Sequence, residues 1–518
     1  MKKTGNRWIA LLLLVTMLAG LLVGCTVQGE DPTTPPATAG RETVPQREPV
    51  DRPTSPQVDP PTEPSAAPPT DPSVAPPTEP TVVPPTEPTV APPTDPPKAT
   101  EPEYEALTNG KYPPIDPDVM PIGAWVAPPH ENILNQGNPS FITDEQFKIL
   151  SESGINLIYG LYEMANDHMP DILKTLDLCE KYGVKYLIRD NNVNEADMDI
   201  MMAALKRYAS HPAFAGVKIM DEPGTTHFDI FAETHEMYKQ LCPDKYYYIN
   251  LLPSYANASQ LQYGAATTRN DGTMDFDTYL ELYIEKVKPA FLSYDYYCIG
   301  GAAGTVQQGY FRDMSKFREL SLEHDIPFWV FIQACGYGNM RTPNEAEIQW
   351  QVNTSLAYGA KGIQYFCYFT PLEDPDGFRG NFIDRNGNKT DIYYYGQRAN
   401  TQIAACDEVL MHCTSKGLIV TGNSIDNTIP AKDKITSYRE LVQVTAQNSG
   451  FLTGCFDHEG KSAYYVVNNS LTNQGSVTLT FEKAVNGVYV FDGVAYEFTG
   501  DSLTLEMMPG EGALVYLK

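Results

Sequence analysis

The sequence predicts a mixed α/β protein in which a (β/α)8 barrel is followed by a C-terminal all-β sandwich. From residue 118 short apolar runs alternate with helical patterns, and eight such units within roughly 300 residues match the size of a (β/α)8 barrel. From about residue 416 the helical period ends and only short strand patterns remain. A doubly wound open sheet is the alternative, but the glycine-rich turn expected after its first strand is absent from the sequence.

The strands of the predicted barrel are short apolar runs. The first is DVMPIGAWVAP, and the fourth stops at two adjacent acids before a Pro-Gly pair. The expected strands span 118–128, 155–163, 184–190, 214–222, 245–252, 290–298, 326–335 and 362–369.

The helices between these strands are indicated by their caps. Thr143 followed by Gln146 is a capping-box pattern at a helix start. Gly183 stands where a helix is expected to end on a left-handed residue. The expected helices span 143–153, 170–183, 195–210, 228–241, 276–287, 311–324, 344–358 and 398–415.

The last region, 416–518, is predicted to be a β-sandwich. Short strands are expected at 464–467, 477–481, 488–491 and 514–517, with turn signals between them. We expect a packing or accessory domain, and a carbohydrate-binding role stays open.

Residues 1–25 are predicted to be a lipoprotein signal peptide. A basic start precedes an apolar run, and Leu22-Val23-Gly24-Cys25 resembles the bacterial box in which the cysteine is lipidated. No second hydrophobic span follows, so we expect a lipid anchor at Cys25 on the outer face of the bacterial cytoplasmic membrane. A plain secretory signal is the alternative.

Residues 26–103 are predicted to be a disordered stalk that precedes a barrel domain at 104–415. From Pro60 an eight-residue unit such as PPTEPTVA repeats, and a segment of this composition cannot bury a core. At ~3.1 Å per residue a straight polyproline stalk would reach on the order of 200 Å.

Charge and cysteine content limit the partners. The net charge of −28 argues against nucleic acid as a partner and fits an extracellular protein that acts on neutral or diffusible material. Eight of the nine cysteines lie beyond Cys25 and form no CxxC pair, so we expect mostly buried thiols. No metal motif is evident, and no metal or cofactor is predicted.

The stretch Ala215-Gly216-Val217-Lys218-Ile219-Met220-Asp221-Glu222-Pro223 indicates the site. It is a buried strand that ends on two carboxylates, and the proline then stops regular pairing. The carboxyl ends of barrel strands meet on one face, where catalytic groups lie. The alternative is that Asp221 caps the next helix and Glu222 is merely solvated.

Several motifs resemble the clan of barrel glycoside hydrolases that includes cellulases and β-galactosidases. His211-Pro212 leading to Asp221-Glu222-Pro223 resembles the clan's fourth strand, and this resemblance implies that Glu222 is the general acid/base. Asp295 and Tyr297 resemble its His-x-Tyr on strand six. The segment from Asp384 to Thr390 resembles the link to the last helix in β-galactosidase-like members. The resemblance covers about 118–415.

Strand seven departs from the clan's pattern, which places a glutamate nucleophile there. Gln333 occupies that place, and an amide cannot attack an anomeric carbon as a carboxylate does. One alternative is an acid from another strand: Asp295, Glu163 or Asp190. The Asp221-Glu222 pair also resembles substrate-assisted N-acetylhexosaminidases, which implies that Asp221 orients an acetamido nucleophile of the sugar. The third alternative is a barrel that only binds sugar.

The remaining candidates are substrate-binding residues. Asp295 and Tyr297 share one face of their strand, Trp125 is a candidate platform for sugar stacking, and Gln333 is expected to face the pocket. Core packing is the alternative for Trp125. The sequence thus predicts an extracellular glycoside hydrolase that acts on an oligo- or polysaccharide of host, plant or microbial origin.

Overall fold

The computed structural model describes residues 104–131, 139–372, 377–422 and 429–518. The predicted lipidation site at Cys25 and the Pro/Thr-rich segment lie outside these residues. Within the described part of the chain, no helix is long and apolar enough to cross a membrane.

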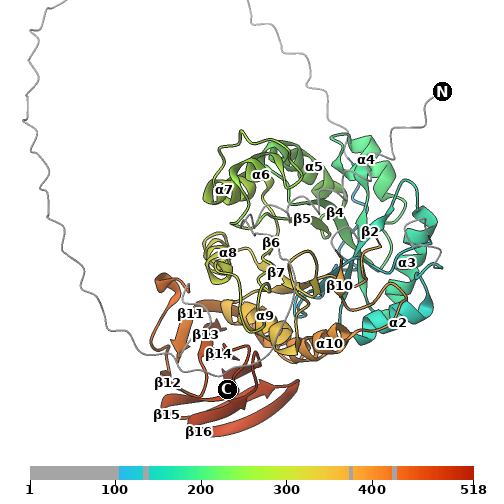
Figure 1. Ribbon diagram of the computed structural model, residues 1–518. Coiled ribbons are helices and arrows are strands. Elements are labelled where there is room, and N and C mark those ends of the chain that lie inside the picture. Colours follow the sequence, from blue (N-terminus) through green and yellow to red (C-terminus); the bar gives the residue numbers. More distant parts are fainter. Residues whose placement is uncertain (1–103, 132–138, 373–376, 423–428) are drawn as a thin grey trace, which may run out of the picture. The chain divides into compact units, whose positions relative to one another are not determined.

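Eight parallel strands form one sheet that curls into a ring, with helices around it (Figure 1). Their order is β5-β4-β3-β2-β1-β9-β7-β6, and an isolated parallel bridge between Leu251 and Tyr294 joins its two ends. The predicted (β/α)8 barrel is therefore confirmed. The strands are β1 (Ile122–Trp125), β2 (Leu157–Met164), β3 (Lys185–Arg189), β4 (Phe214–Asp221), β5 (Tyr246–Asn250), β6 (Leu292–Asp295), β7 (Phe328–Gln333) and β9 (Gly362–Phe366).

The helices follow the predicted order, with two changed helices and an additional short helix, α6, that was not predicted. The third predicted helix, 195–210, is shorter than expected, because the Asp197 side chain accepts hydrogen bonds from two backbone N–H groups and starts the helix there. The last begins earlier, after its N-cap Thr390, and ends before 415 because a strand starts at Cys413. The helices are α2 (Asp144–Glu152), α3 (Met169–Tyr182), α4 (Met198–Leu205), α5 (Phe228–Leu241), α6 (Ala258–Tyr263), α7 (Phe276–Val287), α8 (Tyr310–His324), α9 (Glu345–Tyr358), α10 (Asp391–Ala404) and α11 (Asp407–Met411).

The C-terminal region is an antiparallel sheet that encloses its own core, as predicted for an all-β domain. The long strand β15 pairs with β12 through its first half and with β17 through its second half, which bends the sheet. The strands are β11 (Cys413–Thr421), β12 (Leu441–Gln447), β13 (Phe451–His458), β14 (Lys461–Asn468), β15 (Gly475–Phe491), β16 (Val494–Met507) and β17 (Gly512–Leu517). A short pair, β8 (Cys335–Gly336) and β10 (Arg379–Gly380), lies outside both sheets.

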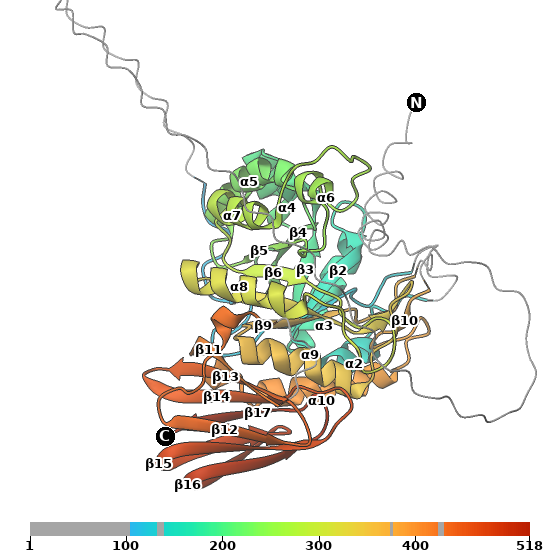
Figure 2. The ribbon, with the colours of Figure 1, turned by 60° about the vertical axis from the view of Figure 1, so that its left-hand side comes forward.

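Helix α9 joins the two domains, and Figure 2 shows it between the barrel and the C-terminal strands. Almost all of its residues are buried, so its polar side chains need partners inside the protein. Asn353 donates to the Gly510 carbonyl at 2.9 Å and accepts from the Tyr465 hydroxyl at 2.8 Å. Asn344 and Glu347 form the capping box at its start. The C-terminal sheet therefore holds α9 in place against strand β7.

Candidate active site

A pocket opens at the carboxyl ends of the barrel strands, and the empty space in it, open solvent included, is about 380 Å³. We call it the cavity. Most of its lining residues are the last residues of their strands, which is where the chemistry of a (β/α)8 barrel is placed. The lining residues are Trp125, Asp221, Glu222, Asn250, Asp295, Tyr297, Phe331 and Phe366.

The structure brings five of the predicted site residues together in this cavity: Asp221, Glu222, Asp295, Trp125 and Tyr297. The three acids come from the ends of β4 and β6, and the two aromatic residues come from β1 and the segment after β6. The arrangement combines carboxyl groups that exchange protons with rings that pack against apolar faces of a ligand.

The backbone at Glu222 turns sharply to aim this side chain. Its φ is 47°, in the left-handed region, where a residue other than glycine costs about 1–3 kcal/mol. The conformation is held because the Glu222 N–H donates to the Asn250 carbonyl at 2.9 Å, and the Glu222 carbonyl accepts from Ala265 N–H at 3.1 Å. Strained backbone that the fold enforces in this way is typical of functional positions.

Asn250, at the end of β5, connects the carboxylates, and the sequence analysis missed it. Its Nδ2 donates to Asp295 Oδ1 at 2.7 Å and to Asp221 Oδ1 at 3.2 Å. Its own Oδ1 accepts from the Ser293 hydroxyl at 2.9 Å, which fixes the orientation of the amide. The Asn250 amide thus binds two acids, one from each of the strands β4 and β6 on either side of β5. Its place at the inward-facing end of a barrel strand was the available signal.

A buried network below the cavity supports Asn250. The hydroxyls of Tyr159 and Tyr248 both donate to Gln364 Oε1, at 2.7 and 2.6 Å, and Gln364 Nε2 donates to Ser293 Oγ at 2.9 Å. These residues come from β2, β5, β6 and β9 and fill the interior of the barrel. Networks that satisfy their polar atoms in this way hold side chains rigidly.

The three carboxyl groups differ in their affinity for a proton. Burial and the charges of Asp295 and Asp221 raise the pKa of Glu222 well above its ordinary value. Burial and the charge of Asp221 raise the pKa of Asp295 to about 8. Burial also raises the pKa of Asp221, but Lys218 and the Asn250 hydrogen bond oppose this. The pKa values of Glu222 and Asp295 are thus raised strongly, while Lys218 and Asn250 limit the rise at Asp221, and such different surroundings assign acid and base roles.

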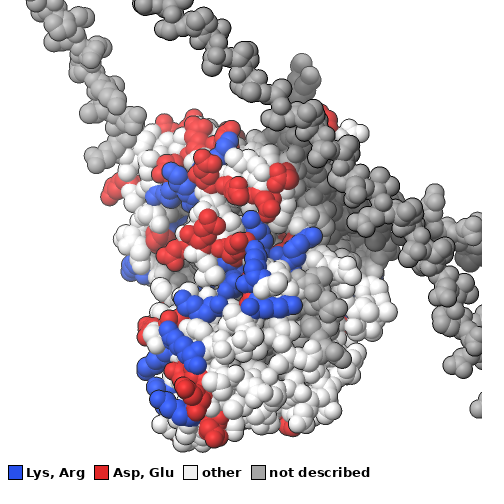
Figure 3. All heavy atoms as spheres, turned by 90° about the vertical axis from the view of Figure 1, so that its left-hand side faces the viewer, with Lys and Arg blue, Asp and Glu red and all other residues white. Residues whose placement is uncertain are grey.

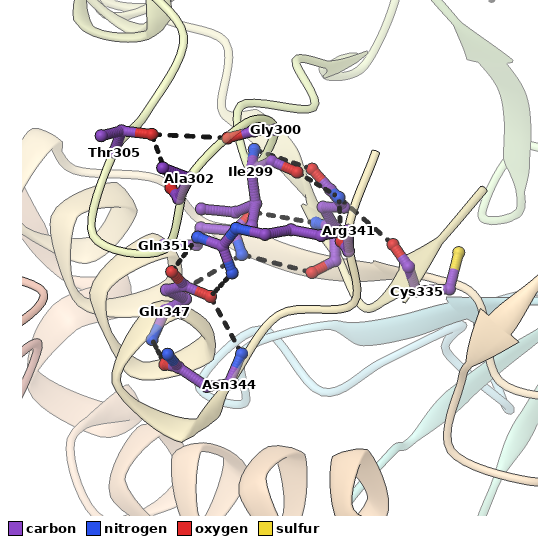
Figure 4. Close-up of polar contacts among 10 residues, drawn as sticks. Ile299, Gly300, Ala302, Thr305, Cys335, Arg341, Asn344, Glu347 and Gln351 are labelled. Carbon is purple, nitrogen blue, oxygen red and sulfur yellow. Dashed lines mark hydrogen bonds and ion pairs between the residues drawn. The ribbon is translucent and has the colours of Figure 1, made fainter. Parts of the chain in front are cut away.

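Gln333 lies outside the lining of the cavity, in contrast to the expectation that it faces the pocket. Its Nε2 donates to the carbonyls of Ile299 and Arg341 at 3.0 and 3.1 Å, and its Oε1 accepts from Ile299 N–H at 2.9 Å. Gln351 of α9 binds its backbone on both sides. Figure 4 shows Ile299, Arg341 and Gln351 gathered at this point, with Arg341 paired to Glu347. The amide fastens the loops after β6 and β7.

Replacing Gln333 with glutamate is therefore expected to destabilise the fold rather than supply a nucleophile. A carboxylate cannot donate, so it would face backbone carbonyl oxygens while fully buried. We expect the free energy of unfolding to fall by roughly 3 kcal/mol or more, measured by denaturant unfolding. The matched control is Gln262→Glu, at a half-buried position away from β7. An unchanged stability together with faster glycoside turnover in the Gln333 variant would contradict the structural role.

Glu163 and Asp190 also lie away from the three acids. Glu163 accepts from both the backbone and the ring of His130 at 2.8 Å. Asp190 accepts from Arg207 at 2.8 Å and from the Tyr208 hydroxyl at 2.9 Å. Glu163 thus holds the segment after β1 and Asp190 the segment after α4, and the structure does not bring either carboxylate to the cavity.

No protein-family model and no curated protein matches the chain. Solved structures do resemble it. A family 39 glycoside hydrolase from Bacteroides cellulosilyticus is 12% identical over 78% of this chain and 82% of that chain, with a TM-score of 0.44. A family 5 glycoside hydrolase from Bacteroides vulgatus is 10% identical over 80% and 95%, with a TM-score of 0.47. A β-galactosidase from Marinomonas ef1 is 9% identical over 57% and 62%, with a TM-score of 0.42.

The similar structures thus include barrel glycoside hydrolases. At these identities and TM-scores they say only what the chain is similar to, and the barrel itself is shown by the strand order of this chain. The resemblance to N-acetylhexosaminidases stays a prediction. What this chain does has to follow from the residues of its own cavity.

Proposed function

We propose that this protein is a glycoside hydrolase in which Glu222 is the general acid/base. The observation that carries the proposal is the set of three carboxyl groups with different proton affinities in one cavity at the carboxyl ends of the strands. Glycoside hydrolysis needs one carboxyl that holds a proton for the leaving oxygen and a second that is ionised.

Glu222 is suited to donate the proton, because burial and the charges of Asp295 and Asp221 favour its protonated form. Asp295 is placed to be the nucleophile or the base, since Asn250 donates to its Oδ1 at 2.7 Å and no carboxylate comes from β7. Its pKa of about 8 means that it serves in this role mainly above neutral pH, where it is ionised. Trp125, Phe331 and Phe366 supply the apolar walls that pack against a sugar ring and exclude water.

A substrate-assisted mechanism is the second candidate. It is favoured by the position of Asp221 in the cavity, directly before the acid Glu222 and held by Asn250 at 3.2 Å. In that mechanism the sugar's acetamido oxygen attacks the anomeric carbon, and Asp221 stabilises the acetamido nitrogen. It requires no carboxylate at the end of β7. A third reading is a cavity that binds sugar without turnover.

A panel of aryl glycosides and glycans tests the proposal. The panel holds α- and β-hexosides, uronides and 2-acetamido sugars, and the readout is released aryl alcohol or reducing sugar. Turnover of a hexoside or uronide supports hydrolysis by Asp295 and Glu222, and turnover of acetamido sugars alone supports the second mechanism. Binding on a glycan array without turnover of any glycoside in the panel would contradict the proposed activity and indicate a sugar-binding protein.

We also propose that the protein is attached to the outer face of the cytoplasmic membrane through Cys25. The support is the Leu22-Val23-Gly24-Cys25 box and the repeats that follow it. Cys25→Ala is expected to abolish lipidation, so the protein should move from the membrane fraction to the medium or accumulate unprocessed. Metabolic labelling with a fatty acid and cell fractionation measure this, with Cys179→Ala as the control. A variant that stays in the membrane and is normally processed would exclude the lipid anchor.

A further inference from the structure

Two cations lie side by side on neighbouring strands of the barrel, and neither is among the residues that line the cavity. Ile188 of β3 pairs with Val217 of β4, so the next residues, Arg189 and Lys218, are neighbours on adjacent strands. Lys218 also pairs with Tyr248, whose hydroxyl lies in the interior network. Lys218 is only 7% exposed, and Arg189 is half-buried. Both side chains therefore belong to the interior of the barrel.

Neither cation has an ion pair among the described residues, which is unusual because buried charges are normally paired. Arg189 uses Nη1 to donate to the Leu161 carbonyl at 2.8 Å. Glu163 acts on Arg189 electrostatically, but its carboxylate is bound to His130. On the surface, by contrast, Lys and Arg lie beside Asp and Glu (Figure 3), as in the pairs Lys316–Asp277 and Arg439–Asp457.

Trp125 connects this pair to the cavity. The Lys218 Nζ lies 3.8 Å from the centre of the Trp125 ring, and Trp125 lines the cavity. The indole Nε1 is buried and has no hydrogen-bond acceptor among the described residues. A buried donor without an acceptor costs free energy, so this indole beside the two cations indicates a missing acceptor at the part of the cavity wall that Trp125 forms.

We propose that Trp125, Arg189 and Lys218 form a subsite for the carboxylate of an acidic sugar, so that the substrate class is a uronic acid-containing glycan. The inference rests on the proposed glycoside hydrolase function and deepens it. A carboxylate presents two acceptor oxygens in one plane, which suits the guanidinium of Arg189 and the ammonium of Lys218.

The charges of the cavity agree with this class of substrate. Burial and, after it, the charge of Arg189 lower the pKa of Lys218 to about 7, and the charge of Asp221 opposes this. Asp221 provides one negative charge nearby, while Glu222 and Asp295 hold protons longer than ordinary acids. A carboxylate brought by the substrate would add a second negative charge beside Asp221 and offset the two cations.

Calorimetric titration of the Glu222→Gln protein tests the subsite without turnover. Glucuronate and galacturonate are compared with glucose and galactose, and each is titrated into the Glu222→Gln protein, its Lys218→Met derivative and a Lys148→Met derivative. Lys148 is exposed and serves as the control. We expect uronates to bind about 10- to 100-fold more tightly than the neutral sugars, and Lys218→Met to remove this preference while Lys148→Met keeps it.

Thermal unfolding separates loss of the subsite from loss of the fold. Lys218→Met removes an unpaired buried charge and keeps the length of the side chain, so the melting temperature is expected to stay or to rise. Uronates that bind no better than neutral sugars, or a preference that survives Lys218→Met, would overturn the subsite. Wild-type turnover of neutral glycosides would then still support the proposed glycoside hydrolase activity. Uronate binding without turnover of any glycoside would instead contradict the hydrolase activity and leave the subsite standing.

Discussion

Glu222→Gln is expected to lower kcat/KM by about 10²–10⁴-fold on a natural glycan, the usual contribution of general acid/base catalysis. Glutamine keeps the size of the side chain but has no proton to transfer to the leaving oxygen. The loss should be smaller on aryl glycosides with activated leaving groups, because these depart without a proton. Steady-state kinetics on one glycan and on a series of aryl glycosides measures both effects.

The matched control for this variant is Glu281→Gln, on the exposed face of α7. It makes the same chemical change far from the cavity and is expected to keep the wild-type kcat/KM. An equal loss for good and poor leaving groups would contradict proton donation by Glu222. An unchanged rate on the natural glycan would remove Glu222 from the mechanism.

Asp295→Asn is expected to have the second large effect, a loss of about 10²–10⁴-fold when the residue acts as a base. Asparagine keeps the contact with Asn250 through its carbonyl oxygen but can neither attack carbon nor accept a proton from water. Asp221→Asn is expected to cost less, because Asp221 then only adjusts the charge of its neighbours. The measurement is kcat/KM of both variants on the same plain hexoside or uronide.

The reverse order would favour the substrate-assisted mechanism. In that case Asp221→Asn is the more damaging change, thiazoline-type inhibitors bind, and sugars without an acetamido group are inert. Efficient turnover of a plain hexoside without thiazoline inhibition would exclude this mechanism. The two aspartates therefore serve as controls for one another.

The barrel and the position of the three acids could be predicted from the sequence, because both follow from the local pattern of apolar and polar residues. Apolar runs that alternate with capped helices specify strand–helix units, and parallel strands bring their last residues to one face. That rule places Asp221, Glu222 and Asp295 together without any knowledge of distances. The helix boundaries at 197 and 390 were missed because each depends on a single capping side chain.

The residues that the sequence did not reveal depend on contacts between distant strands. Asn250 looks like an ordinary end of a strand until Asp221 and Asp295 are placed on either side of it. Lys218 stands in an apolar run, and only the barrel interior shows that it has no ion pair among the described residues and lies over the Trp125 ring. Gln333 was expected in the pocket because its position matched the clan's nucleophile, but the loops after β6 and β7 close over it and use its amide.

Where the proton resides in the cavity is tested most directly by a carbon-13 NMR titration of the carboxyl groups, with Glu222→Gln to assign the Glu222 signal. Glu222 is expected to titrate well above its ordinary pKa of 4.5, because burial and the charges of Asp295 and Asp221 disfavour its ionised form. Asp221 is expected to ionise at lower pH than Asp295 and Glu222. A Glu222 signal that titrates near 4.5, with all three carboxyl groups ionised at pH 7, would contradict the proposed role of Glu222 as the acid.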